Sequence, residues 1–378
     1  MDSKNIITIN GNTYSFDPDE TILQVAERNG IYIPTLCYLE RGTPTGTCRI
    51  CLVEVEGVST LVPSCATPAV HNMKVRTESP RVVRARRLNL ELLLASGQHN
   101  CIAQGMDEES WTDFQLRAME PEEHHDLCPA YGDCRLQDLA IKYRVKSTRF
   151  SPTHTSYPIE DVNPFIVRDF SRCILCGRCV QACNEVQVNN IISFGYRGAA
   201  SKIVTKGDLA LRDSDCVFCG ECVQACPVGA LIPKRDLELK IRSTDTKKVR
   251  TTCTYCGVGC QIYLHVANDR VVKVTGVSDV GPNYGSLCVK GRFGYDFIHD
   301  EGRLKTPLIK ENGEFREASW DEALSLVAKR LSGIKEATGP DSIMVLTSAR
   351  TSNEENYIAQ KFARAAIGTN NIDHCARL

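Results

Sequence analysis

The arrangement of twenty cysteines constrains this 378-residue sequence more than any other feature. All of them except Cys375 fall into five groups with short internal spacings. Disulfide frameworks belong to short secreted chains, whereas these cysteines are tightly clustered in a long one. Thiolates are soft ligands that suit iron–sulfur clusters or zinc. The sequence therefore predicts a chain that binds metal centres through its cysteines.

An internal repeat between residues 173 and 226 indicates iron–sulfur clusters rather than zinc. The run C-x2-C-x2-C-x3-C occurs twice, and each copy puts three sulfur atoms on one loop, as a cubane requires. Structural zinc usually takes two separated pairs of ligands. In two-cluster ferredoxins the fourth cysteine of each run binds the other cluster. We therefore predict two [4Fe–4S] clusters, one held by Cys173, Cys176, Cys179 and Cys226, and one by Cys216, Cys219, Cys222 and Cys183.

The N-terminal group consists of Cys37, Cys48, Cys51 and Cys65. Well-separated ligand pairs around a Gly-containing loop suit a [2Fe–2S] cluster, and zinc is the alternative. The preceding residues predict strands over 4–9 and 13–16, joined at Asn10-Gly11, and then a helix that ends at Gly30. A β-grasp ferredoxin begins with this order of elements.

The middle group has only three cysteines, Cys101, Cys128 and Cys134. A [4Fe–4S] cluster here needs a fourth ligand of another type, and neutral imidazole can coordinate iron. We assign His99, which lies two residues before the first cysteine of the group. His124 and His125, just before the second cysteine, are the alternative ligands, and a group without a cluster is the third possibility. Residues 102–127 are interpreted as an acidic insertion.

The last group consists of Cys253, Cys256, Cys260 and Cys288. Lys290 follows closely, either as a solvated charge or as a cation that bridges the group to an anionic cofactor. Further on, 342–347 is typical of a buried parallel strand, and 353–366 predicts a helix that ends at Gly368. Cys375 is interpreted as an ordinary buried thiol.

The overall charge argues against a nucleic-acid partner, because 45 Lys and Arg balance 46 Asp and Glu. An amphipathic helix is predicted over 80–96, and its arginines are interpreted as a solvated face: Arg81, Arg84, Arg86 and Arg87. Residues 145–165 are rich in Ser, Thr and Pro and predict a linker across the surface.

No stretch of the sequence resembles a signal peptide or a transmembrane segment, so we expect a cytoplasmic chain. The Gly-x-Gly-x-x-Gly pattern of dinucleotide-binding domains is also missing from the sequence. A nicotinamide, if one is used, is therefore expected to bind another subunit.

Two resemblances emerge from these residues. The groups from Cys37 to Cys65, His99, the stretch Cys134-Arg-Leu-Gln-Asp-Leu-Ala and the double run resemble the large cluster-bearing subunit of complex I and its hydrogenase relatives. The stretches 252–260, 287–297 and 371–378 resemble the opening of a molybdenum or tungsten formate dehydrogenase alpha subunit. Together the two resemblances cover nearly the whole chain.

The resemblance implies one [2Fe–2S] and four [4Fe–4S] clusters. The cluster of Cys253, Cys256, Cys260 and Cys288 would lie nearest the pterin, and Lys290 would carry the electron between them. In the full-length protein, a molybdenum or tungsten bis(pyranopterin guanine dinucleotide) would oxidise formate to carbon dioxide. The electrons would pass to an NAD(P)-linked flavoprotein, an iron–sulfur subunit, a ferredoxin or a hydrogenase-type partner.

Two departures from the resemblance affect what this chain does alone. Relatives have only two residues where 102–127 are inserted. In the family a cysteine or selenocysteine metal ligand follows the Cys-Ala-Arg-Leu motif, and Leu378 is the last residue here. We expect a selenocysteine codon at that point and a chain without catalytic residues of its own. The alternative is a short adaptor that connects an NAD(P)-linked flavoprotein to a hydrogenase or a similar partner.

The predicted fold is a multidomain α+β chain. We expect a β-grasp [2Fe–2S] domain over 1–79, a small [4Fe–4S] domain over 80–150 and a two-cluster ferredoxin module over 151–245. A [4Fe–4S] molybdopterin oxidoreductase domain would occupy 246–305, and the start of an α/β molybdopterin-binding domain would occupy 306–378.

Overall fold

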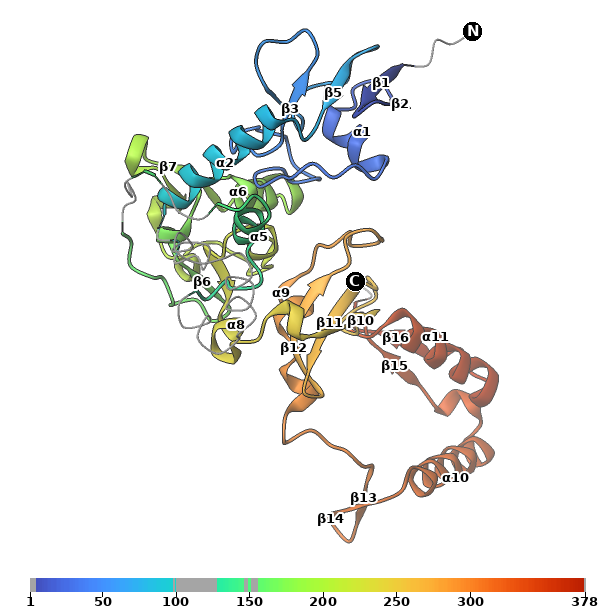
Figure 1. Ribbon diagram of the computed structural model, residues 1–378. Coiled ribbons are helices and arrows are strands. Elements are labelled where there is room, and N and C mark those ends of the chain that lie inside the picture. The colour runs from blue at the N-terminus through green and yellow to red at the C-terminus, as the bar shows by residue number, and fades with distance from the viewer. Residues whose placement is uncertain (1–4, 98, 100–127, 146–148, 151–155, 377–378) are drawn as a thin grey trace. The chain divides into compact units, whose positions relative to one another are not determined.

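The computed structural model describes residues 5–97, 99, 128–145, 149–150 and 156–376 (Figure 1). It divides into two compact units, Met1–Thr246 and Lys247–Leu378. Helices and strands occur together in both units, which confirms the predicted α+β class. No helix within the described ranges is long and apolar enough to cross a membrane.

The first unit begins with a five-stranded sheet in the order β2-β1-β5-β3-β4. Its strands are β1 (Ile6–Ile9), β2 (Asn12–Ser15), β3 (Leu52–Val55), β4 (Val62–Pro63) and β5 (Lys74–Arg76). Strands β1 and β2 form the expected antiparallel hairpin, and β1 pairs in parallel with β5. Asn10 and Gly11 both have positive φ, as the tight hairpin turn requires.

Helix α1 (Ile22–Arg28) packs against this sheet, and the two together form a buried apolar core. Thr21 and Gln24 build a capping box at its start, and Gly30, at φ 71°, follows its end as predicted. The helix buries Ile22, Leu23, Val25 and Ala26 against the sheet residues. Cys51 and Cys65 belong to the same buried cluster, so the sheet and helix position half of the N-terminal cysteine group.

Helix α2 (Pro80–Ala95) confirms the predicted helix and corrects one detail of it. Its buried face includes Val82, Arg86, Leu90 and Leu94, which recur every four residues. The prediction that all four arginines are solvated is wrong for Arg86, whose side chain is fully buried. Its guanidinium donates hydrogen bonds to Glu78 Oε1 at 2.6 Å, Tyr143 Oη at 2.7 Å and the Leu52 carbonyl at 2.8 Å. These acceptors replace water around the charge.

The double run lies on short elements that follow α5 (Arg135–Lys142) in the chain. Helix α6 (Arg178–Gln181) continues into the π-helix η3 (Ala182–Val186), and α7 (Glu221–Ala225) lies within the second copy and carries Cys222. Two antiparallel pairs frame them: β6 (Ile166–Arg168) with β9 (Leu231–Pro233), and β7 (Ile192–Gly195) with β8 (Lys202–Thr205). Helix α8 (Lys234–Leu239) leads to the end of the unit.

The second unit begins with an antiparallel meander and continues into a hairpin and a helix. The meander strands are β10 (Lys247–Thr252), β11 (Gln261–Ala267) and β12 (Arg270–Gly276), and α9 (Val289–Phe293) contacts β12. The hairpin strands are β13 (Leu308–Glu311) and β14 (Glu314–Glu317), followed by α10 (Trp320–Thr338).

The last elements form a β-α-β unit. Strands β15 (Val345–Thr347) and β16 (Ile372–His374) pair in parallel, with α11 (Asn353–Lys361) and the π-helix η10 (Phe362–Ile367) between them. This confirms the predicted parallel strand and helix, but the expectation of a buried strand is wrong. Met344 and Leu346 are 57% and 73% exposed, because none of the described residues covers that side of β15.

Candidate metal centres

The four N-terminal cysteines come together as two pairs. The sulfur atoms of Cys51 and Cys65 lie 3.3 Å apart, and Cys37 shares a hydrogen bond with Cys48. In each pair the hydrogen bond between the thiols lowers the pKa of one and raises that of the other. The pKa is lowered to about 5 for Cys37 and to about 7 for Cys51. Two pairs of thiols are what the two irons of a [2Fe–2S] cluster require.

The first predicted set of the double run lines one enclosed apolar pocket. Cys173, Cys176, Cys179 and Cys226 all border it, beside Ile174 and Ile192. Burial raises the pKa of Cys176 to about 12 and that of Cys173 to about 11, and the charge of Cys226 contributes to both shifts. Cys226 therefore lies with the first three cysteines, although it is the last cysteine of the second copy.

The second predicted set shows the reciprocal arrangement. Burial raises the pKa of Cys216, and the charges of Cys219 and Cys183 act in the same direction. The Ile191 amide approaches Cys183 Sγ at 3.4 Å, and Asn189 Nδ2 approaches Cys219 Sγ at 3.9 Å. Cys183 from the first copy thus lies within electrostatic reach of the second copy, as the crossed pattern predicts.

The two copies share an unusual backbone. Leu175 and Phe218 occupy equivalent positions, and both have left-handed conformations, at φ 51° and 52°. The amide of each donates to the sulfur of the first cysteine in its run at 3.4 Å. Gly177 and Gly220 also have positive φ and begin the helices α6 and α7. Amide groups turned toward sulfur stabilise negative charge on the thiolates.

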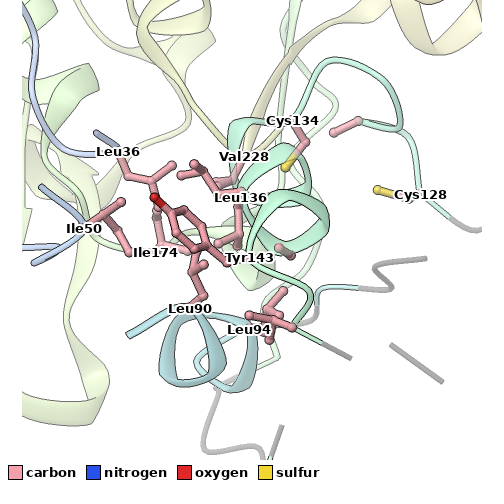
Figure 2. Close-up of a cluster of buried hydrophobic side chains, with 14 of the residues drawn as sticks. Leu36, Ile50, Leu90, Leu94, Cys128, Cys134, Leu136, Tyr143, Ile174 and Val228 are labelled. Carbon is pink, nitrogen blue, oxygen red and sulfur yellow. The ribbon is translucent and has the colours of Figure 1, made fainter. Parts of the chain in front are cut away.

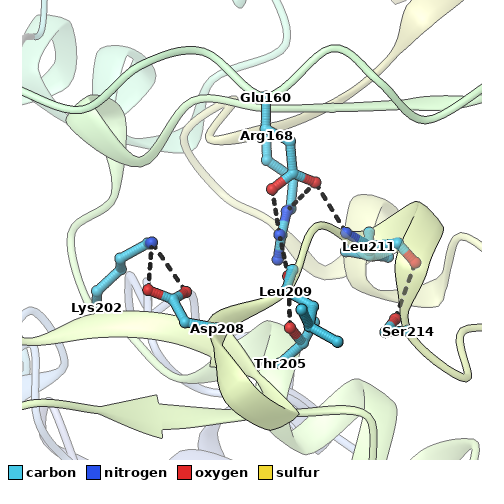
Figure 3. A network of polar contacts seen from close by, with 8 residues as sticks. All are labelled: Glu160, Arg168, Lys202, Thr205, Asp208, Leu209, Leu211 and Ser214. Carbon is cyan, nitrogen blue, oxygen red and sulfur yellow. Dashed lines mark hydrogen bonds and ion pairs between the residues drawn. The ribbon is translucent and has the colours of Figure 1, made fainter.

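A polar network fixes the loop before the second copy (Figure 3). Arg168, on β6, forms a buried ion pair with Glu160, and the same carboxylate accepts the Leu211 amide at 3.0 Å. The Leu209 carbonyl accepts hydrogen bonds from Arg168 at 3.3 Å and from Thr205 Oγ1 at 2.5 Å. Arg168 also borders the pocket of the first set, so the network ties this loop to that pocket.

Two members of the middle group lie in a buried core shared with other cysteines (Figure 2). Cys128 and Cys134 pack in a core that contains Leu90, Leu94 and Leu136. Other candidate ligands contact this core: Cys48, Cys173, Cys176 and Cys226. The core therefore connects three cysteine groups through apolar packing.

His99 is buried beside the same part of the first unit. A Cβ on Gly97 would lie 2.7 Å from His99 Nε2 and 2.8 Å from the Ser171 carbonyl, so the ring packs where Gly97 has no side chain. The adjacent Arg172 approaches Cys128 Sγ at 3.5 Å. His99 and Cys128 thus approach the same turn, 170–172. The other predicted members, Cys101, His124 and His125, lie outside the described residues.

The last group is formed by two loops of the second unit. Burial raises the pKa of Cys260, and the charges of Cys253, Cys256 and Cys288 contribute in turn. Asn353 Nδ2 donates to the Gly257 carbonyl at 2.7 Å, which ties this cysteine loop to the start of α11. Cys288, before α9, and Lys290, within α9, are exposed.

Among the described residues, no three His, Cys, Asp or Glu side chains lie close enough together to hold one metal ion.

A pocket lies at the carboxyl ends of β15 and β16. Thr347, Ser348, Asn356 and His374 are among its lining residues. Ligands of open α/β sheets bind beyond the carboxyl ends of parallel strands. Cys375 follows β16, and its exposure corrects the prediction of a buried thiol: it lies in a surface turn, with its sulfur 3.4 Å from Ser348 Oγ.

Four known sequence families match successive parts of the chain. Residues 4–80 match the 2Fe-2S iron-sulfur cluster binding domain, and 172–230 match the 4Fe-4S dicluster domain. Residues 246–300 match the molybdopterin oxidoreductase Fe4S4 domain, and 303–378 match the molybdopterin oxidoreductase domain. The chain therefore contains a 2Fe-2S domain, a 4Fe-4S dicluster domain and, over 246–378, molybdopterin oxidoreductase domains. These matches confirm the predicted 2Fe-2S, 4Fe-4S dicluster and molybdopterin oxidoreductase domain types, and the small [4Fe–4S] domain over 80–150 stays a prediction.

Curated relatives match this chain over nearly all of its length. It is 33% identical to "Putative formate dehydrogenase YrhE" and 31% identical to "Probable oxidoreductase YjgC", both from Bacillus subtilis. Each match covers 100% of this chain and 40% of the relative. "Putative formate dehydrogenase SAUSA300_2258" from Staphylococcus aureus is 31% identical over 98% of this chain and 39% of its own length. The chain therefore spans about two fifths of the length of these relatives.

One solved structure resembles part of this chain. A chain from the crystal structure of NAD+-reducing [NiFe]-hydrogenase in the H2-reduced state is 32% identical, with a TM-score of 0.50. The match covers 61% of this chain and 88% of that chain.

Sequence reasoning missed one residue at these sites. Arg178, in the first copy of the repeat, is 6% exposed and lies between two cysteine groups. The signal was available in the repeat itself, because the equivalent residue of the second copy is Glu221. A change from a cation to an anion between otherwise similar copies marks a position where the two sites differ.

Proposed function

We propose that this chain carries electrons through one [2Fe–2S] and four [4Fe–4S] clusters between a formate-oxidising site of the full-length protein and a partner redox protein. The observation that supports the proposal is the gathering of thiols in separate groups within a chain that contains molybdopterin oxidoreductase domains. Similarity along the whole chain to proteins named as formate dehydrogenases favours formate as the substrate.

The [2Fe–2S] cluster is held by the two thiol pairs. Cys37 and Cys48 would bind one iron, and Cys51 and Cys65 would bind the other, because each iron takes two thiolates. The crossed sets of the double run hold two [4Fe–4S] clusters: Cys173, Cys176, Cys179 and Cys226, and Cys216, Cys219, Cys222 and Cys183.

The remaining cluster of the first unit is held by His99, Cys101, Cys128 and Cys134. Support comes from the approach of His99 and Cys128 to one turn. Iron and sulfide assays after anaerobic purification test this assignment. The whole chain should contain about 18 iron atoms, and His99→Ala should lower the value to about 14. An unchanged iron content in His99→Ala would favour the alternative ligands.

The second unit holds the cluster nearest the pterin, through Cys253, Cys256, Cys260 and Cys288. A molybdenum or tungsten bis(pyranopterin guanine dinucleotide) supplies the two-electron oxidation of formate when it is bound. Exposed Lys290 would provide a cation beside it, and the polar pocket at β15 and β16 would contact part of it. We assign none of these residues a role in proton transfer during formate oxidation.

The electron partner is an NAD(P)-linked flavoprotein, an iron–sulfur subunit, a ferredoxin or a hydrogenase-type protein, and the complex acts in the cytoplasm. The likeness to a chain of an NAD+-reducing hydrogenase also favours a second candidate, a short adaptor between a flavoprotein and such a partner. Mass spectrometry of the native complex separates the two functions. A working complex that contains a 41.9 kDa species supports the adaptor, and formate-dependent cluster reduction by a longer chain supports the dehydrogenase.

A further inference from the structure

One buried cation links the backbones of two cysteine groups in the first unit. The Arg178 side chain is 6% exposed, at the start of α6. Its Nε donates to the Ala225 carbonyl at 2.6 Å, and its Nη1 donates to the Tyr38 carbonyl. Ala225 immediately precedes Cys226, and Tyr38 immediately follows Cys37. The two arms of one guanidinium thus hold the chain beside one cysteine of each group.

The charge of Arg178 is retained at neutral pH. Arginine stays protonated in proteins, and this guanidinium donates hydrogen bonds to the residues beside Cys226 and Cys37. The cation therefore lies within electrostatic reach of both cysteine groups. Because the guanidinium is buried, its positive charge acts through protein of low dielectric constant rather than through water.

Two further contacts, one from α6 and one from the η3 helix that continues it, join this region to the Cys37 loop without a cation. Gln181 Nε2 donates to the Thr43 carbonyl at 2.6 Å, and Glu185 accepts the Thr43 amide at 2.6 Å. A Cβ on Gly42 would lie 2.8 Å from Gln181 Oε1, so the helix and this loop are in close contact. The second copy of the repeat has buried Glu221 in place of Arg178, so the repeat itself does not require a cation here.

We propose that Arg178 is a positioning residue for electron transfer, which holds the Cys37 loop against the Cys226 loop and raises the reduction potentials of both clusters. The proposal rests on the proposed function, because it requires these cysteines to bind clusters. Transfer moves one electron from one cluster to the other, with no bond made or broken. The reduced form of either cluster carries one more negative charge, and a fixed cation stabilises that form.

Redox titration of the anaerobically purified 378-residue chain, followed by electron paramagnetic resonance, tests the proposal. Arg178→Met should lower the potentials of the [2Fe–2S] cluster and of the neighbouring [4Fe–4S] cluster. We expect a shift of at least tenfold in the reduced-to-oxidised ratio, about 59 mV for a one-electron couple. Arg178→Lys keeps the charge and should restore most of each potential.

Gln181→Met is the matched control, because it removes a hydrogen bond between α6 and the Cys37 loop and leaves the charge of Arg178 intact. An equal drop in this variant would assign the effect to a loosened contact and overturn the role of charge. Unmoved potentials in Arg178→Met would overturn the inference too. If Arg178→Met does not assemble its clusters, Arg178→Gln must show the same drop. Iron content separates the two proposals: a parent chain without iron contradicts the proposed function, whereas iron with unmoved potentials contradicts only this inference.

Discussion

At the scale of single residues, Arg86 shows how a charge can support a cluster-binding loop from inside the protein. Its side chain is fully buried, and its three acceptors come from three different segments. One of them is the Leu52 carbonyl, directly after Cys51. Glu78 is the anionic partner and is half exposed, so it can regain water if the arginine is removed. The Leu52 carbonyl is buried and has no such compensation.

Arg86→Met should therefore destabilise the first unit, because it leaves the Leu52 carbonyl and the Tyr143 hydroxyl without their donor. We expect a loss of about 2–4 kcal/mol in the free energy of unfolding, measured by denaturant titration. Arg84→Met is the control, since Arg84 is exposed on the same helix and should change the value by less than about 0.5 kcal/mol. Equal losses in the two variants would contradict the role of burial.

Cys375 offers a second test at this scale. A hydrogen bond with Ser348, followed by one from the Ala349 amide, lowers the pKa of this exposed thiol. A lower pKa means more thiolate at neutral pH and faster alkylation, so Ser348→Ala should slow labelling by iodoacetamide near pH 7. The difference should vanish well above the ordinary thiol pKa. Mass spectrometry of the peptide that contains Cys375 measures the rate, and an unchanged rate at neutral pH would argue against the hydrogen bond.

At the scale of elements, the repeated cluster loops depend on left-handed backbone. Leu175 and Phe218 adopt it despite their side chains, and their amides point to sulfur. Gly177 follows at φ 77° and starts α6, the helix that carries Arg178. The strain of the loop is thus distributed over residues that either tolerate it, as glycine does, or gain a hydrogen bond from it.

Gly177→Ala should destabilise the first unit by about 1–2 kcal/mol, because an L-residue in the left-handed region brings its Cβ against the following carbonyl. A Cβ there would also lie 3.2 Å from the Phe194 ring. Gly177→Asn should lose less, since asparagine tolerates this conformation. Thermal unfolding and iron content measure the effects, and a larger loss in the asparagine variant would show that space rather than φ controls the position.

The elements that local signals specify were predicted well. Asn10-Gly11 determines the first hairpin, and Gly30 and Gly368 end the helices they were expected to end. The buried position of Arg86 could not be predicted, because its acceptors lie on other segments of the chain. The crossed ligand sets of the double run stay a prediction from cysteine spacing, supported by the position of Cys226 beside Cys173 and Cys176. The middle group depends on longer connections, so its histidine stays a prediction.

At the scale of the whole molecule, the two units differ in how completely they bury their apolar residues. The first unit packs cysteines of three groups on one core. In the second unit, α10 and α11 bury no residue, and the parallel strand β15 exposes Leu346. Parallel strands are normally covered on both faces, which is why the sequence predicted a buried strand. The sequence pattern indicates which side of an element is apolar, but it does not identify the segment that packs against that side.

The exposed stripe of α10 should bind the dye ANS, since contiguous exposed apolar surface takes up such probes. Trp320, Leu324, Val327 and Ile334 are each between 46% and 68% exposed and recur at helical spacing. The double variant Leu324→Gln with Val327→Gln should lower the ANS fluorescence of the 378-residue chain while circular dichroism stays the same, because glutamine is a good helix former. Lys329→Gln, on the same helix, is the control and should leave the fluorescence unchanged. If the double variant binds as much dye as the parent chain, the probe is bound elsewhere and this stripe is not the accessible surface.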